Sequence, residues 1–240
     1  QLTSAGAVFL PEAQEILDKM QKAIVKTKLA YNGSTNALRI GVVQGYEHSD
    51  MPDALQRFCA RNPSIPISVY RSNASALYAD LQETKLDVAF NTMISANAFI
   101  PSNISYQALA RYPLAVFLPS NHPLATKNFL HLSDLSDEPL IFPDLQDDPS
   151  GYNKELLDYF IQSGFTPTIV RESNNFEAIL LMVASTLGLT LLPSYATFLA
   201  QSLGNIAVVP LTDDNLQVDI VIAWHNQSQN PLIRKFLSVV

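Results

Sequence analysis

Apolar side chains recur at spacings of three and four along the first 24 residues, which is typical of one stripe of a helix. The stripe consists of Phe9, Ala13, Ile16, Leu17, Met20, Ala23 and Ile24. Charged residues such as Glu12, Glu15, Lys19 and Lys22 fall on the opposite side. We therefore expect a helix over residues 1–31, which ends in the Asn-Gly-Ser-Thr run at 32–35.

This stripe has two possible partners, its own domain or a second copy of the same helix. The run at 32–35 has the composition of a linker, which separates the helix from the chain that follows. The linker favours the second copy. We predict that this helix dimerises through Phe9, Ile16, Leu17, Met20 and Ile24.

From Leu38 the pattern changes to short apolar runs that alternate with amphipathic segments. Strands are predicted at 38–43, 65–70 and 87–90, and helices at 51–60 and 74–84. Alternation of strand and helix predicts right-handed crossovers and a mostly parallel sheet.

A second series of the same kind begins at residue 114. Its predicted strands are 114–118, 140–142, 168–171, 190–192, 206–209 and 218–224. Its predicted helices are 153–162, 176–185 and a short helix from Pro231. The chain has 240 residues, enough for one large domain or two small ones, and the fold class is α/β.

Charge and composition argue against several classes of function. The formal net charge is −7, whereas direct nucleic-acid binding needs a basic surface. No apolar run approaches the ~18–20 residues of a membrane span, so we expect no membrane partner. The N-terminus lacks the basic leader of a signal peptide. The single cysteine, Cys59, excludes an internal disulfide, and we expect it to be a small buried residue.

Motifs of catalysis and of metal binding are missing from the sequence. It contains no GxSxG elbow, no GxGxxG, no phosphate loop and no HExxH. The four histidines are far apart in sequence and are not paired with Cys59. We expect no enzyme activity, no cofactor and no metal site.

Several stretches, "LSDLSDEPLIF" among them, carry a family resemblance. "LTSAGAVFLPEAQEIL" resembles the end of the winged helix-turn-helix and the linker helix of LysR-type transcriptional regulators. "LAVFLPSNHPLA" and "SGFTPTIVRESNNFEAILLMVASTLGLTLLPSYA" resemble the effector-binding domain of that family. Ser185-Thr186 stands where the family usually has alanine-glycine. The resemblance covers nearly the whole chain.

The resemblance implies two Rossmann-like subdomains of the type 2 periplasmic-binding-protein kind, preceded by the linker helix. Subdomain I is expected at 38–109 and 212–240, and subdomain II at 113–209, with hinges near 110–112 and 209–211. The expected partners are a small-molecule effector, further copies of the chain, and promoter DNA through an N-terminal winged helix-turn-helix. Such a protein is cytoplasmic. A solute-binding protein of an uptake system has the same fold and stays an alternative.

Small ligands favour the carboxyl ends of strands and the amino ends of helices, which predicts where an effector binds. The candidate ligand-binding residues at these edges are Gln44, Gly45, Tyr46, Asn73, Ala74, Ser75, Asn91, Thr92, Ser150, Tyr152, Asn174 and Asn175. Several have a plain structural alternative. Asn73, Ser75, Asn174 or Asn175 can simply cap a helix, and Tyr46 can lean into the cleft or sit on the surface.

The charge of the effector is a separate question. Glu47, Asp144 and Glu172 put acid near the expected cleft, and Arg71 and Arg171 are the nearest arginines in sequence. A carboxylate ligand prefers a bidentate guanidinium. Our hypothesis is that the effector is neutral, amphipathic or cationic rather than a small dianion.

Overall fold

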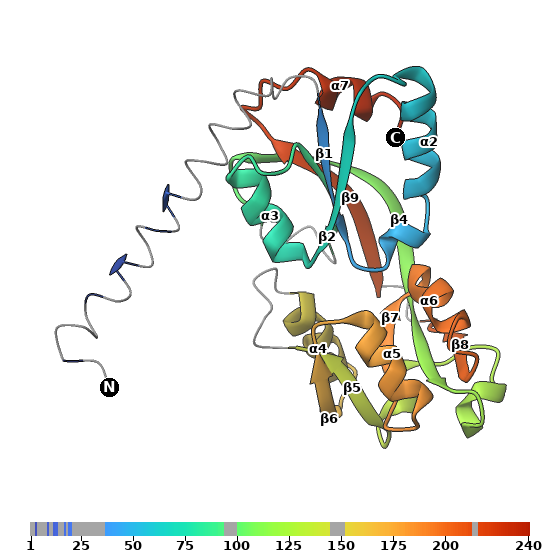
Figure 1. Ribbon diagram of the computed structural model, residues 1–240. Coiled ribbons are helices and arrows are strands. Elements are labelled where there is room, and N and C mark those ends of the chain that lie inside the picture. The colour runs from blue at the N-terminus through green and yellow to red at the C-terminus, as the bar shows by residue number, and fades with distance from the viewer. Residues whose placement is uncertain are drawn as a thin grey trace.

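The computed structural model describes residues 37–93, 100–144, 152–212 and 216–240, together with Thr3, Phe9, Glu12, Ala13, Leu17, Lys19 and Met20. Figure 1 shows two lobes, with the long strand β4 running from one to the other. The strands are β1 (Leu38–Val43), β2 (Ile67–Ser72), β3 (Val88–Met93), β4 (Ile104–Pro119), β5 (Pro139–Pro143), β6 (Thr168–Ser173), β7 (Thr190–Pro193), β8 (Ile206–Pro210) and β9 (Gln217–His225). The helices are α2 (Met51–Arg61), α3 (Ala74–Gln82), α4 (Tyr152–Gln162), α5 (Phe176–Ala184), α6 (Thr197–Gln201) and α7 (Leu232–Leu237).

The sheet of the first lobe has the order β2-β1-β3-β9-β4. β1 pairs in parallel with β2 and β3, as the strand–helix alternation predicts. β9 runs antiparallel to both β3 and β4, and β4 is antiparallel to β7 and β8 in the second lobe. The prediction of a mostly parallel sheet is therefore wrong: the sheet is mixed, because the chain crosses between the lobes and returns antiparallel.

Both faces of the first lobe's sheet are covered by helices. Phe90 points to the face of α2 and α7, where its ring centroid lies 6.0 Å from that of Phe236. The preceding Ala89 points to the opposite face, that of α3, since strand side chains alternate. On that face a Cβ on Gly41 would stand 2.6 Å from Leu77 and 3.4 Å from Ala89, so α3 packs directly on the β1 backbone. An Arg39–Asp87 ion pair, 4% exposed at Asp87, fixes β1 beside the start of β3.

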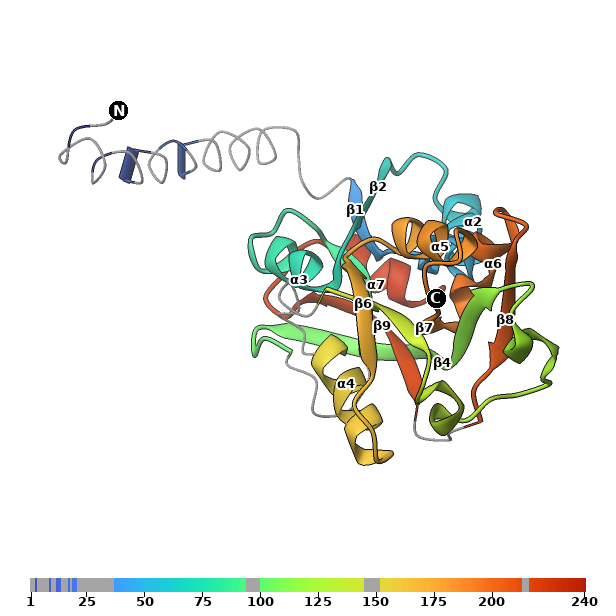
Figure 2. The ribbon, with the colours of Figure 1, turned by 90° about the horizontal axis from the view of Figure 1, so that it is seen from below.

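The chain passes from the first lobe to the second within the strand β4 (Figure 2). Its first part pairs with β9 as far as Pro113, and its second part pairs with β8 from Ala115. The sequence predicts only the second part of β4 as a strand. The polar residues before Leu114 interrupt the apolar pattern there, because the first part of β4 is partly exposed. The predicted hinges near 110–112 and 209–211 stay predictions, and they lie close to this change of pairing and to the end of β8.

One further expectation was wrong, and one helix was not predicted. Cys59 is exposed, because it lies on the outer side of α2 while Phe58 occupies the core. The short helix α6 was missed, since only Ala200 of its residues is buried and it has no apolar stripe. Among the described residues, no helix is long and apolar enough to span a membrane.

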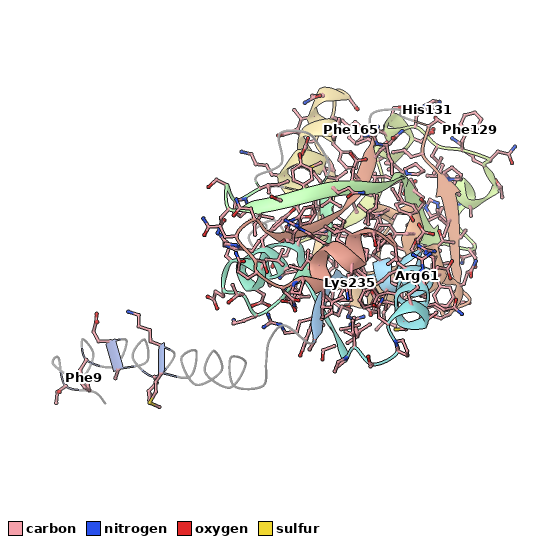
Figure 3. The ribbon with its side chains drawn as sticks, turned by 90° about the horizontal axis from the view of Figure 1, so that it is seen from above. Phe9, Arg61, Phe129, His131, Phe165 and Lys235 are labelled. Atoms are coloured by element: carbon pink, nitrogen blue, oxygen red, sulfur yellow. The ribbon has the colours of Figure 1, made fainter. Side chains whose placement is uncertain are left out.

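From Phe9 on, the described residues of the predicted dimerisation helix are helical, and the large apolar side chains among them are exposed. Phe9, Leu17 and Met20 are 68%, 58% and 53% exposed. Figure 3 shows Phe9 far from the globular body. Ile16 and Ile24 lie outside the described residues.

Candidate functional site

The candidate site lies where β1, β2 and β3 end and where α3 and α5 begin. α3 belongs to the first lobe and α5 to the second, so the predicted edges come from both lobes. Two polar contacts and one aromatic cluster connect the lobes here.

The start of α3 is held by its cap. The Asn73 side chain accepts hydrogen bonds from the Ala76 backbone N–H (2.8 Å) and the Ser75 hydroxyl (3.0 Å). The capping alternative for Asn73 is therefore confirmed. Within the described residues, the backbone N–H groups of Ala74 and Ser75 have no hydrogen-bond acceptor, as is usual in the first turn of a helix.

Asn91 lies below this cap and is fully buried. Its side-chain nitrogen donates to the Ala74 carbonyl (2.9 Å), and its side-chain oxygen accepts from the Thr92 N–H (2.9 Å). Both polar atoms thus serve the protein itself. Asn91 positions the start of α3 against the end of β3.

The start of α5 is built in the same way. Asn175 accepts from the Ala178 N–H at 2.9 Å, and its own N–H donates to the Ser173 hydroxyl at 3.3 Å. The capping alternative thus holds for Asn175, and Asn174 precedes it. The next N–H, that of Phe176, donates to the Gln44 side-chain oxygen in the other lobe at 3.4 Å. Gln44 is therefore a contact between lobes.

The second polar contact between lobes is a cluster of three charges. Arg71, at the end of β2, donates through Nη1 to Glu47 at 3.2 Å and to Glu177 of α5. These hydrogen bonds raise the pKa of Arg71 and keep it charged, and the bond to Glu177 contributes more than the bond to Glu47. The cluster carries one positive and two negative charges. Arg171 instead donates to the carbonyl of Val170.

Aromatic rings connect the lobes beside this cluster. Tyr195 of the second lobe lies 5.8 Å from Tyr46 and 5.3 Å from Tyr112, both edge to face. Tyr46 is 2% exposed, so the alternative that it sits on the surface is wrong. Burial is the main cause that raises the pKa of Tyr46, with smaller contributions from Tyr112 and Asp50.

Gly45 lies at the contact between the lobes. Its φ of +87° favours glycine, and a Cβ there would stand 3.2 Å from Tyr195 and 3.3 Å from Phe176. Because glycine has no side chain, Tyr195 and Phe176 of the other lobe can pack against the backbone of Gly45.

The rest of the predicted site is only partly described. Ser150 lies outside the described residues, and Tyr152 is the first residue of α4. The Asn153 side chain, which sequence reasoning missed, donates to the Asp144 carbonyl at 2.7 Å and fixes the start of α4. In the described ranges, no group of three or more His, Cys, Asp or Glu side chains is suited to hold a metal ion.

Comparison with known proteins identifies the family. The sequence model of the LysR substrate binding domain matches residues 32–240. The chain belongs to the LysR substrate-binding domain family. This confirms the resemblance seen in the sequence, and the chain contains the effector-binding domain of a LysR-type regulator.

Similar LysR-type proteins are transcriptional regulators. The chain is 26% identical to the regulator AlsR of Bacillus subtilis, over all of this chain and 77% of AlsR. It is 29% identical to BudR of Raoultella terrigena, over all of this chain and 81% of BudR.

A solved LysR-type structure confirms the fold class. The BenM effector-binding domain in complex with its effector benzoate superposes with a TM-score of 0.73 at 25% identity. The superposition covers 85% of this chain and 89% of that domain.

Proposed function

We propose that a small effector binds between the two lobes and that its binding changes how the protein regulates transcription. The observation that carries this proposal is the meeting of α3 and α5 from opposite lobes. Arg71, two residues before the cap of α3, pairs with Glu177 in the first turn of α5. A ligand at this junction touches both lobes at once, so it favours one arrangement of them over others.

The proposed ligand contacts are the predicted ones: Gln44, Gly45, Tyr46, Asn73, Ala74, Ser75, Asn91, Thr92, Ser150, Tyr152, Asn174 and Asn175. Their expected roles differ. The N–H groups of Ala74 and Ser75 can donate to a ligand directly, because the Asn73 cap satisfies only Ala76 among the first-turn groups. Asn91 acts through Ala74, since both of its polar atoms are already bonded.

We further propose that the effector is neutral, amphipathic or cationic rather than a small dianion. The Arg71 guanidinium already faces Glu47 and Glu177, so this side of the junction has a net charge of −1. A dianion would meet like charge there and would have to displace a carboxylate from Arg71.

A thermal-melt screen at fixed salt tests the ligand proposal. At about 100 times its Kd, a ligand adds about 2.7 kcal/mol, and for a chain of this size that raises Tm by about 5–11 °C. We expect a rise with neutral, amphipathic or cationic compounds. A rise with carboxylates alone would refute the charge argument.

Matched variants locate the ligand. Gln44→Met removes an amide at the junction, and Gln56→Met makes the same change on the exposed side of α2. We expect the ligand-induced rise in Tm to shrink in the first variant and to persist in the second. Equal rises in both variants would remove Gln44 from the ligand contacts.

Oligomerisation is proposed to run through the N-terminal helix, by way of Phe9, Ile16, Leu17, Met20 and Ile24. Its support is the exposure of the described apolar side chains. In sedimentation experiments, Leu17→Gln should weaken self-association, whereas Glu12→Gln, on the polar side, should not. Unchanged association of Leu17→Gln would count against this helix as the interface.

The remaining proposals follow from the regulators to which the chain is similar. We propose subdomains at 38–109 with 212–240 and at 113–209, and promoter DNA as a partner through a winged helix-turn-helix. An effector then alters the spacing of the DNA-reading heads. We also propose a cytoplasmic location and no enzyme activity.

A further inference from the structure

The aromatic contact between the lobes lies beside the point where the chain crosses from one lobe to the other. It consists of the rings of Tyr46, Tyr112 and Tyr195, of which only Tyr195 belongs to the second lobe. Tyr112 is the second-last residue of β4 that pairs with β9, so it stands directly before the crossing. The two polar contacts between the lobes lie instead at the starts of α3 and α5.

The hydroxyl of Tyr112 fixes its ring to the first lobe. This hydroxyl donates its hydrogen to the Asp50 carboxylate, and its oxygen accepts from the Ser49 hydroxyl at 2.7 Å. Burial and the bond to Asp50 raise the pKa of Tyr112, so the hydroxyl keeps its proton. Hydrogen bonds to an ionised acceptor are about twice as strong as neutral ones. The Tyr112 ring therefore moves with the first lobe.

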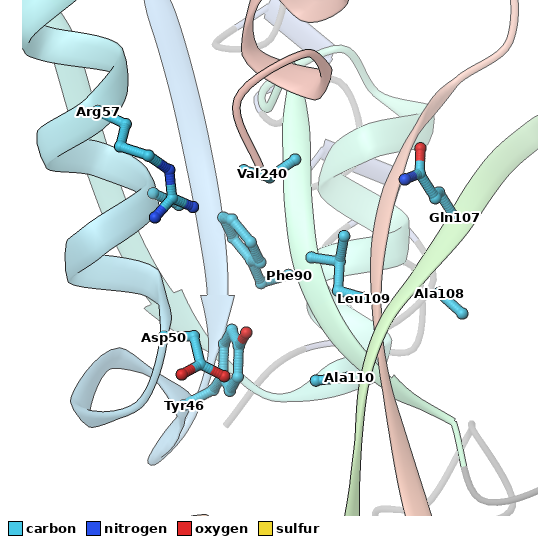
Figure 4. A pocket seen from close by; sticks show the side chains of 10 residues that line it. Tyr46, Asp50, Arg57, Phe90, Gln107, Ala108, Leu109, Ala110 and Val240 are labelled. Carbon is cyan, nitrogen blue, oxygen red and sulfur yellow. The ribbon is translucent and has the colours of Figure 1, made fainter.

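Asp50 serves this bond rather than its own helix. It is the N-cap residue of α2, a position where an aspartate usually accepts from the free N–H groups of the first turn. In the part of the chain that the structure describes, the Asp50 side chain makes no such capping bond. Its carboxylate bonds to Tyr112 instead, and Figure 4 shows it beside the Tyr46 ring. The start of α2 thus holds the aromatic contact in place.

The contact with the second lobe permits rotation. Tyr195 meets Tyr46 and Tyr112 edge to face, with ring centroids 5.8 Å and 5.3 Å apart. Edge-to-face pairs are favourable over centroid distances of about 4.5–7 Å, so Tyr195 can change its angle and stay in contact. Hydrogen bonds tolerate much less, since they weaken steeply with distance and angle. The same rotation would therefore break the polar contacts at α3 and α5 first.

We propose that Tyr112 is the pivot between the lobes, and that its bonds to Asp50 and Ser49 set their resting angle. The second lobe turns with Tyr195 on the rings of Tyr46 and Tyr112. The space between the starts of α3 and α5 then changes, while the aromatic contact persists. Tyr112 is thus a positioning residue, which acts on the effector site through the angle between the lobes. This inference rests on the proposed function, in which an effector favours one arrangement of the lobes.

Distances between two spin labels measure this angle without any ligand. Cys59 is the single cysteine and is exposed on α2 of the first lobe, and Gln201→Cys adds an exposed label position on α6 of the second. Dilution with unlabelled chain restricts the measurement to distances within one copy. Tyr112→Phe keeps the ring and removes the hydroxyl. Tyr106→Phe makes the same change at an exposed position of the same strand and is the matched control.

The distance distributions decide between a pivot and a purely structural residue. Loss of a hydrogen bond to a charged group weakens the preference for the resting angle about ten-fold or more. We expect Tyr112→Phe to broaden or shift the distribution, Tyr112→Ala to do so further, and Tyr106→Phe to leave it unchanged. If both Tyr112 variants match the control, the proposal is overturned, whether or not their Tm is lower.

Asp50→Ala tests the same bond from its acceptor side. It should change the distances in the same direction as Tyr112→Phe, whereas Asp53→Ala, in the first turn of the same helix, should not. No change with Asp50→Ala would overturn the role of the bond. Because these measurements need no ligand, they are independent of the thermal-melt screen. A screen without a hit counts against the proposed function, and unaltered distances count against the pivot.

Discussion

Gly45 is the position at which one added methyl group tests the contact between the lobes. Gly45→Ala places a Cβ 3.2 Å from the Tyr195 ring and 3.3 Å from the Phe176 ring. It also forces alanine to adopt a φ of +87°. The variant therefore combines backbone strain with overpacking at the junction.

The two costs can be estimated separately. A left-handed conformation costs a non-glycine residue about 1–2 kcal/mol. Both contacts are shorter than the ~3.5–4.0 Å optimum for carbon atoms, and overpacking of this kind costs about 1–3 kcal/mol. The Tyr195 ring cannot give way freely, because it packs against Tyr46 and Tyr112. We expect Gly45→Ala to lose about 2–5 kcal/mol of unfolding free energy.

Gly164→Ala separates the strain from the contact. Gly164 has a φ of +95°, and nothing lies within 4 Å of a Cβ there. Urea unfolding of both variants should show Gly45→Ala less stable than Gly164→Ala by about 1–3 kcal/mol, which is the overpacking cost alone. Equal losses would refute the reasoning, because they would mean that Tyr195 and Phe176 do not press on Gly45 in solution.

Three further variants test other features of the structure. Asp87→Ala should cost about 3–5 kcal/mol in urea unfolding, because it leaves the half-buried Arg39 without its carboxylate; a loss below ~1 kcal/mol, the value for a surface pair, would contradict this. Asn91→Ala should lower both stability and effector affinity, since it frees the Ala74 carbonyl at the start of α3; unchanged affinity in a calorimetric titration would show that α3 keeps its place without it. A backbone hydrogen bond and a lysine lower the pKa of Asp134 below 3.8, so its stabilising effect is present above that pH and is lost as the pH falls through the folded pKa. The stability deficit of Asp134→Asn at pH 7, measured by urea unfolding, should therefore shrink as the pH falls through the folded pKa of Asp134, and a deficit that does not change with pH would exclude this linkage.

Local patterns determined much of the fold. The starts of α2, α3 and α5 and most strands follow from apolar periodicity and from capping residues, because these signals act over a few neighbouring residues. Asn73 and Asn175 were recognisable as caps for the same reason. Motifs in the correct order were enough to indicate the LysR family.

The contacts between lobes could not be predicted from the sequence. Arg71 and Glu177 are 106 residues apart, and no periodic or compositional signal connects them. The exposed first part of β4 carries no strand pattern, since its polar residues face solvent while its backbone pairs with β9. Tertiary pairing, rather than local preference, makes that segment a strand.

The same limit applies to a pocket in the first lobe (Figure 4). Its lining includes Tyr46, Arg57, Leu109 and Val240, which come from three distant segments of the chain, and each alone has the pattern of an ordinary core or surface residue. The sequence by itself determined the elements, their caps and the family, because those depend on neighbours along the chain. Only the tertiary structure decided which charges are paired, which ring closes the junction and where a cavity is left, because these depend on how distant segments pack.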